Sequence, residues 1–149
     1  MIRVQEAPFD VCAELAALSA GRTDIGAVAS FVGLVRDRAG DQAIRAMTLE
    51  HYPGMTERKL AEIEAEACGR WPLQASLIVH RYGRMLPGEP IVLVATAAQH
   101  RRAALEACAF LIDWLKTQAP FWKLEESGAT SRWVEARDAD ERAADRWRR

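Results

Sequence analysis

One long apolar segment, residues 100–123, constrains the fold of this chain more than any other part of its sequence. It reads HRRAALEACAFLIDWLKTQAPFWK, with cationic side chains at both ends. The apolar run is too long for a typical strand, and apolar residues on nearly every face predict a buried helix. Pro120 disfavours the α region for Ala119, so the helix should end there and the chain should continue as an extended segment at residues 121–123.

The size and composition are those of one globular domain spanning residues 1–149. A chain of 149 residues, of which half are hydrophobic and 28% charged, is not disordered. The net charge of −1 gives no general attraction to nucleic acid or to a membrane surface, so any affinity for anions must be local. We recognise no signal peptide or membrane-spanning run, and the three cysteines are far apart. These features predict a reduced, cytosolic protein.

Two apolar stretches predict the centre of a sheet. Residues 26–36 form a nearly continuous apolar strand, expected to be covered on both faces, which ends at Arg36 before a mobile polar loop at residues 37–42. Residues 44–52 alternate partly and should pair with that strand. Further strands are predicted at 3–6, 75–82 and 90–98, helices at 10–20 and 56–70, and a charged, helical or frayed tail at 138–149. This order predicts an α+β fold, with helices packed against a mainly antiparallel sheet.

Several common chemistries find no support in the sequence. The three histidines, His51, His80 and His100, lack metal-ligand spacing, and we interpret His51 and His80, inside strands, as structural. No glycine-rich phosphate loop and no GxSxG motif occurs. Cys12 and Cys108 lie among alanines and leucines, so we expect small buried hydrophobes rather than nucleophiles. The sequence therefore predicts no metal site.

What remains is a set of cations around the long helix: Arg36, His100, Arg101, Lys116 and Lys123. The N-terminus of a helix binds anions through its free N–H groups, and the side chains of residues 100–101 add donors there. Lys123 follows two large aromatics, and apolar surroundings disfavour a charged amine, which suits proton transfer or attack on a carbonyl. Lys116 at the helix C-terminus also has a purely structural interpretation, as does Arg36 at a strand end. The residues alone leave open an anion-handling active site and a charged surface.

Several long stretches resemble the large, catalytic subunit of molybdopterin synthase, the MoaE family. They are TLEHYPGMTE (48–57), RWPL (70–73), HRYGRMLPGE (80–89), HR (100–101), FLIDWLKTQAPFWKLE (110–125) and RWVEAR (132–137). The resemblance runs from about residue 8 to residue 147. It implies an α/β hammerhead-like fold in a single domain. It also implies a cytoplasmic sulfurtransferase of molybdenum cofactor biosynthesis, which inserts two sulfurs into cyclic pyranopterin monophosphate to make molybdopterin and needs no resident cofactor.

The resemblance also implies a partner and a set of site residues. Sulfur would arrive as a thiocarboxylate on the C-terminal Gly-Gly of a small ubiquitin-like, MoaD-like subunit whose tail enters a pocket. Lys116 would act on the carbonyl of that tail, and Lys123 would transfer protons or stabilise an intermediate. Contacts with the pterin phosphate would involve Leu34, Val35, Arg36, His100, Arg101, Lys116, Lys123, Leu124, Glu125 and Arg137.

Helix geometry adds a prediction about assembly. His100 and Lys116 are sixteen residues apart in the sequence, which separates their Cα atoms by about 24 Å on one helix. If both ends serve one small substrate, the His100–Arg101 end must come from a second protomer. We therefore expect a homodimer with composite sites and, with two carriers, a heterotetramer. Two alternatives are a non-catalytic scaffold for a ubiquitin-like carrier and another phosphate-ester-binding transferase.

Overall fold

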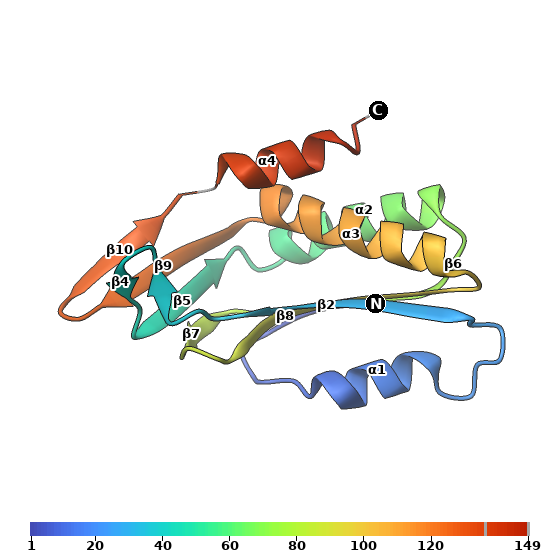
Figure 1. The fold of residues 1–149 in the computed structure, drawn as a ribbon, viewed down its shortest axis with the longest axis horizontal. Coiled ribbons are helices and arrows are strands. Elements are labelled where there is room, and N and C mark those ends of the chain that lie inside the picture. The colour runs from blue at the N-terminus through green and yellow to red at the C-terminus, as the bar shows by residue number, and fades with distance from the viewer. Residues whose placement is uncertain (136, 149) are drawn as a thin grey trace.

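The computed structural model describes residues 1–135 and 137–148, which form two four-stranded sheets, a small hairpin and four helices (Figure 1). The strands are β1 (Ile2–Gln5), β2 (Ala27–Leu34), β3 (Arg38–Ala39), β4 (Gln42–Ala43), β5 (Ala46–His51), β6 (Leu73–Arg81), β7 (Gly83–Met85), β8 (Pro90–Ala98), β9 (Phe121–Ser127) and β10 (Thr130–Val134). The helices are α1 (Val11–Ser19), α2 (Met55–Arg70), α3 (Arg101–Gln118) and α4 (Asp138–Asp145). Within the described ranges every strand pair is antiparallel except β1 with β6, which confirms the α+β fold.

The first sheet, in the order β1-β6-β8-β2, carries helices on both faces. Helix α1 lies on one face, and α2, α3 and α4 lie on the other (Figure 1). Successive side chains of a strand point to opposite faces, so Val92 and Val94 of β8 pack under α2 and α3, whereas Leu93 and Ala95 meet α1. Burial on both faces explains why β6 and β8 are nearly continuous apolar runs.

Helix α3 is the long helix that the sequence predicts. It begins after His100 and ends at Ala119, whose extended backbone (φ −72°, ψ 131°) precedes Pro120. Its inner stripe, which includes Ala104, Cys108, Leu111 and Leu115, is buried against the first sheet. The expectation of burial on nearly every face is too strong, because Leu105 is 60% exposed on the outer side.

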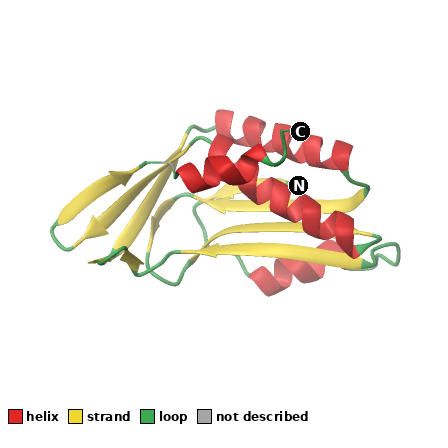
Figure 2. Ribbon diagram, turned by 45° about the horizontal axis from the view of Figure 1, so that its top comes forward, coloured by secondary structure: helices red, strands yellow, loops and turns green. Residues whose placement is uncertain are grey.

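The second sheet, in the order β10-β9-β5-β7, extends beyond one end of the first (Figures 1 and 2). Strand β5 pairs with β7 and β9, so the prediction that residues 44–52 pair with the preceding long strand is wrong. The reason is tertiary: Met47 and Leu49 of β5 pack with Val35 and Met85 in a separate apolar cluster, which holds β5 away from the first sheet.

Strand β2 is an edge strand of the first sheet, beside β8, and its faces are covered only in part, which corrects the expectation that both are covered. Val28, Phe31 and Leu34 are 43%, 36% and 53% exposed. A continuous apolar run indicates a strand, but it does not say which neighbours cover that strand. In this chain β2 carries exposed apolar surface along its length.

Other local expectations have mixed outcomes. The predicted tail, described as far as residue 148, forms α4 over most of its length, while residue 149 lies outside the described residues. The polar loop at residues 37–42 forms most of the β3–β4 hairpin, with Gly40 at φ 62°. Helix α2 begins slightly before the predicted residue 56: its N-cap is Gly54, whose backbone N–H donates to the Glu57 carboxylate. Cys108 is buried as expected, but Cys12 is exposed. None of the helices in the described residues is long and apolar enough to cross a membrane.

Candidate active site

A cavity of about 360 Å³ opens where the two sheets meet beside the C-terminal end of α3. Its walls come from the end of β2, the starts of β8 and β9, the last turn of α3, and the segment that follows β10. Five cationic side chains and three carboxylates line it: Arg36, Arg38, Lys116, Lys123 and Arg137, with Glu125, Glu135 and Asp140. Because the chain has a net charge of −1, any affinity for anions must be local, and this predominantly cationic cavity is the candidate place for it.

Strand β9 forms the floor of the cavity with every second side chain. Phe121, Lys123 and Glu125 face the cavity, opposite His51, Leu49 and Met47 of β5. The side chains between them point to the other face of the sheet. Leu124 therefore lies outside the cavity, although the sequence predicts it as a substrate contact.

The two lysines enter the cavity from different elements. Lys116 comes from the last turn of α3, and Lys123 from β9. Burial lowers the pKa of Lys123, and the charges of Lys116, Arg137 and Arg36 lower it further, while Glu125 acts in the opposite direction. This direction agrees with the expectation from the aromatic residues that precede Lys123. An amine that loses its proton more readily than ordinary lysine is suited to proton transfer.

The position of Arg36 is set by a turn from another part of the chain. The turn at residues 86–89 has Gly88 at φ 88°, the conformation that the second central position of a type II turn requires, and it binds Val35 through two backbone hydrogen bonds. The Val35 N–H donates to the Glu89 carbonyl at 3.0 Å, and the Gly88 N–H donates to the Val35 carbonyl at 2.7 Å. Arg36 follows directly, at the rim of the cavity.

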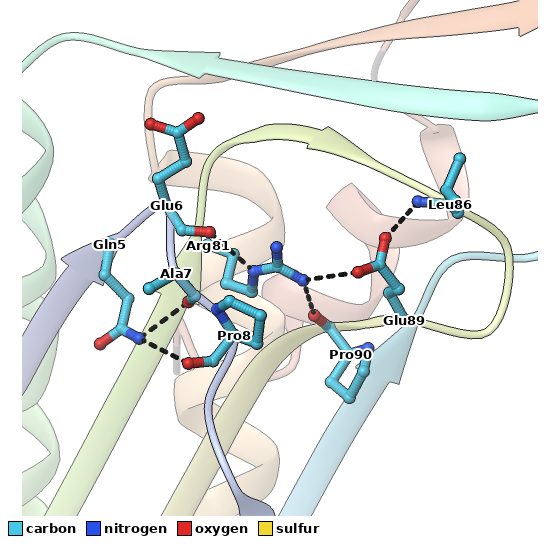
Figure 3. Close-up of polar contacts among 8 residues, drawn as sticks. All are labelled: Gln5, Glu6, Ala7, Pro8, Arg81, Leu86, Glu89 and Pro90. Atoms are coloured by element: carbon cyan, nitrogen blue, oxygen red, sulfur yellow. Dashed lines mark hydrogen bonds and ion pairs between the residues drawn. The ribbon is translucent and has the colours of Figure 1, made fainter.

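The side chain of Arg81 holds that turn in place through contacts with Glu89 and Pro90 (Figure 3). Its side chain is 5% exposed; Nε donates to the Glu6 carbonyl at 3.0 Å, and an Nη donates to the Pro90 carbonyl at 3.4 Å. The same Nη lies 3.6 Å from the Glu89 carboxylate, which also accepts from the Leu86 N–H. The buried guanidinium thereby ties the N-terminal segment to the turn that holds Arg36 in place.

His100 and Arg101 lie outside the cavity, at the opposite end of α3 from Lys116. The structure thus brings together Leu34, Val35, Arg36, Lys116, Lys123, Glu125 and Arg137 from the predicted set. Within a single protomer, His100 and Arg101 are separated from Lys116 by the length of α3, as helix geometry predicts.

Sequence reasoning missed several lining residues. His80, interpreted as structural, lines the cavity at the end of β6, and its ring stacks on Phe121 with centroids 3.8 Å apart. Arg38, Glu135 and Asp140 come from short segments whose position no periodicity defines. The alternation of β6 places His80 on the α3 side of the sheet, but no sequence signal indicates a cavity there.

The arrangement favours anion binding and amine chemistry. In the described residues no three His, Cys, Asp or Glu side chains gather in a way that could hold a metal ion. Burial raises the pKa of the Cys108 thiol to about 11, which makes this cysteine a poor nucleophile. No cysteine is among the described residues that line the cavity, so sulfur chemistry there would need sulfur from elsewhere.

Comparisons with known proteins give one family. The sequence model of the family described as "MoaE protein" matches residues 4–118. The molybdopterin synthase catalytic subunit of Mesorhizobium japonicum is 54% identical over 149 residues, covering 99% of this chain and 92% of the relative. The subunit of the same name from Pseudomonas aeruginosa is 56% identical over 146 residues, covering 98% and 97%. The solved structure titled molybdopterin biosynthesis MoaE protein from Burkholderia ambifaria superposes with a TM-score of 0.85 at 52% identity, covering 100% of this chain and 98% of that one.

Proposed function

Because the chain belongs to the MoaE protein family, we propose that it is the catalytic subunit of a molybdopterin synthase. In this role it converts cyclic pyranopterin monophosphate into molybdopterin, in molybdenum cofactor biosynthesis. The sulfur comes from the C-terminal glycine thiocarboxylate of a small ubiquitin-like carrier, so the chain acts as a sulfurtransferase. The three free cysteines support a reducing, cytosolic setting.

The observation that carries this proposal is the cationic cavity at the junction of the two sheets. Arg36, Lys116, Lys123 and Arg137 converge on a volume of about 360 Å³, which suits one small phosphorylated ligand. Among the residues that the structure describes, none of these four cations forms an ion pair. Cations without protein partners are available to bind the anionic groups of a substrate.

The cavity supports a division of roles between its two lysines. Lys116, at the rim on α3, would donate hydrogen bonds to the carbonyl of the carrier's C-terminal glycine while the thiocarboxylate sulfur attacks the pterin. Lys123, whose pKa is lowered by burial, would transfer a proton to or from the developing intermediate. Arg36 and Arg137 would hold the phosphate and the pterin oxygens, and Glu125, 7% exposed on the floor, would accept from the ligand.

His100 and Arg101 enter this proposal through a second protomer. They lie one helix length from Lys116, so they would complete the cavity of a neighbouring copy in a two-fold homodimer. Each of the two composite sites would receive one carrier tail, which gives a heterotetramer. The exposed apolar side chains of β2 supply surface that such an assembly can bury.

The direct test is formation of the dithiolene from cyclic pyranopterin monophosphate, with this chain and a thiocarboxylated carrier. Lys116→Ala should lose almost all turnover while it still binds the carrier. Lys59→Ala is the matched control, because Lys59 is a half-buried lysine of α2 that pairs with Glu62 at 3.1 Å and does not line the cavity. A well-folded wild-type chain that binds the carrier but forms no product would refute the enzymatic function and favour a scaffold.

The shared site has its own test, which uses mixed dimers. Arg101→Ala and Lys116→Ala chains should each be inactive alone, but a mixed dimer would contain one site with neither substitution. Random pairing of equal amounts should restore about one quarter of wild-type activity. Arg102→Ala is the control, because Arg102 is bound to Glu106 on the same helix and should not be needed. Mixtures that recover no activity would contradict the composite site.

A further inference from the structure

His80 is held rigidly at the wall of the cavity. It shares one face of β6 with Ile78, which packs in the core under α2 and α3. Its imidazole is 5% exposed and nearly parallel to the Phe121 ring, at an interplanar angle of 15°. Beyond Phe121 the row of rings continues through tilted contacts with His51 and Tyr82. The stack joins the two sheets and leaves the His80 ring little freedom to turn.

The tautomer of His80 follows from its one hydrogen bond. Nδ1 lies 2.8 Å from the Arg81 carbonyl, which can only accept, so Nδ1 carries the hydrogen. Burial lowers the pKa of His80 to about 4, opposed by the Arg81 carbonyl and assisted by the charges of Lys116 and His51. The imidazole is therefore neutral at physiological pH, and Nε2 presents a lone pair.

That lone pair contrasts with the groups around it. No residue in the described part of the chain donates a hydrogen bond to Nε2, although His80 lines the cavity. The polar neighbours that dominate the cavity, including Lys116, Lys123 and Arg36, are donors. A phosphate would engage those donors but would leave Nε2 without a partner. The unused acceptor therefore suits an uncharged N–H or O–H donor of the same ligand.

We propose that Nε2 of His80 accepts a hydrogen bond from an N–H group of the pterin ring and so fixes the orientation of the substrate beside Lys116. This inference rests on the proposed function, which supplies the ligand. With a fixed acceptor at one wall and cations at the rim, the two ends of a pterin phosphate would bind different groups, so the ligand would bind in a single orientation. His80 is in this view a substrate-binding residue in addition to its structural contacts.

Two substitutions distinguish the contribution of Nδ1 of His80 from that of Nε2. His80→Asn keeps a polar group near Nδ1, able to donate to the Arg81 carbonyl, and loses the group at Nε2. His80→Gln does the reverse, since its amide oxygen can reach the place of Nε2. We expect His80→Asn to bind cyclic pyranopterin monophosphate about tenfold more weakly in calorimetry, as for loss of one hydrogen bond, and His80→Gln to retain most of the affinity. Binding of the carrier should be the same for both variants.

A spectroscopic measurement tests the same contact without turnover. The chain has three histidines, so ¹⁵N-histidine labelling gives few ring signals, and those of His80 are identified by their absence in His80→Gln. In the complex with a carrier that lacks the thiocarboxylate, the Nε2 signal should be that of an unprotonated nitrogen and should move when the pterin substrate is added. Nδ1 should stay protonated throughout.

The outcomes distinguish the two proposals. If the wild-type complex does not bind the pterin phosphate, the proposed function fails. If the wild type binds it and His80→Asn binds it equally well, or if the Nε2 signal does not move, the role of His80 is structural and the inference is overturned. A shift of Nε2 caused by the carrier alone would also overturn it, because the donor would then lie on the glycine tail.

Discussion

The buried guanidinium of Arg81 allows a stability prediction to be worked out from its contacts. Arg81→Met keeps an unbranched apolar side chain and removes the three polar interactions of Arg81 that Figure 3 shows. The bond to the Glu6 carbonyl, at 3.0 Å, contributes about 2 kcal/mol as a hydrogen bond from a charged donor. The contacts with Pro90 and Glu89, at 3.4 and 3.6 Å, are longer and together contribute about 1–2 kcal/mol.

We therefore expect Arg81→Met to lower the free energy of unfolding by about 3 kcal/mol, a large share of the stability of a typical domain. Urea unfolding followed by tryptophan fluorescence measures this directly, and the midpoint should fall by roughly 1–2 M. The activity should fall as well, because the loosened turn at residues 86–89 no longer holds Val35 and Arg36 in place.

The control for this experiment is Arg84→Met. Arg84 is an arginine of the neighbouring strand β7, paired with Glu126 at 3.0 Å, but its side chain is 59% exposed. An exposed pair contributes at most about 1 kcal/mol. If Arg81→Met cost no more than Arg84→Met, the argument that the buried arginine organises the turn would be wrong.

Three further predictions concern buried polar groups. Folding lowers the pKa of His80 from 6.5 to about 4, so in this pH range the unfolded chain binds a proton that the folded chain does not. As the pH falls from 6.5 to 4, the free energy of unfolding should therefore drop by about 3 kcal/mol. Urea titrations at the two pH values should show a smaller drop for His80→Phe. Thr96→Val removes a buried hydrogen bond from Oγ1 to the Ala104 carbonyl (2.6 Å) and should cost about 1 kcal/mol in thermal unfolding; an unchanged midpoint would contradict this. Lys123→Met replaces an amine whose charged form is disfavoured, so it should raise the free energy of unfolding while it abolishes turnover. A loss of stability in urea titrations would contradict the burial argument.

The fold was predictable where the residues of an element themselves determine its type and its ends. The end of α3 before Pro120 follows from local rules, as do the strands β6 and β8. The pairing of β5 was not predictable, because neighbours in sequence usually pair and nothing in residues 44–52 indicates the strand β9, which lies seventy residues later. The exposure of β2 was missed for a related reason, since its apolar run says nothing of its position at the edge.

The candidate site was predictable in part, and mainly through the resemblance. The unusual context of Lys123 after two aromatics indicated a lowered pKa from the residues alone, and the length of α3 separated Lys116 from His100. His80 was missed because a histidine inside an apolar strand is most often structural, and its place beside the cavity depends on how two sheets meet. A junction of this kind is a property of the tertiary structure, and no local pattern encodes it.

Side chains of β9 alternate between the cavity and the other face of the sheet, and this limits which mutations such a chain can accept in evolution. Lys123 and Glu125 face the cavity, whereas Trp122 and Leu124 face away, so a single-residue deletion after α3 would exchange the two sets. A side chain in β9 can change alone, but an insertion or deletion there shifts every functional group at once. The hairpin beyond it, with Gly128 at φ 61°, lies past the last lining residue of β9 and can change in length at little cost. Selection should therefore act on the number of residues between Pro120 and Glu125 before it acts on most of their identities.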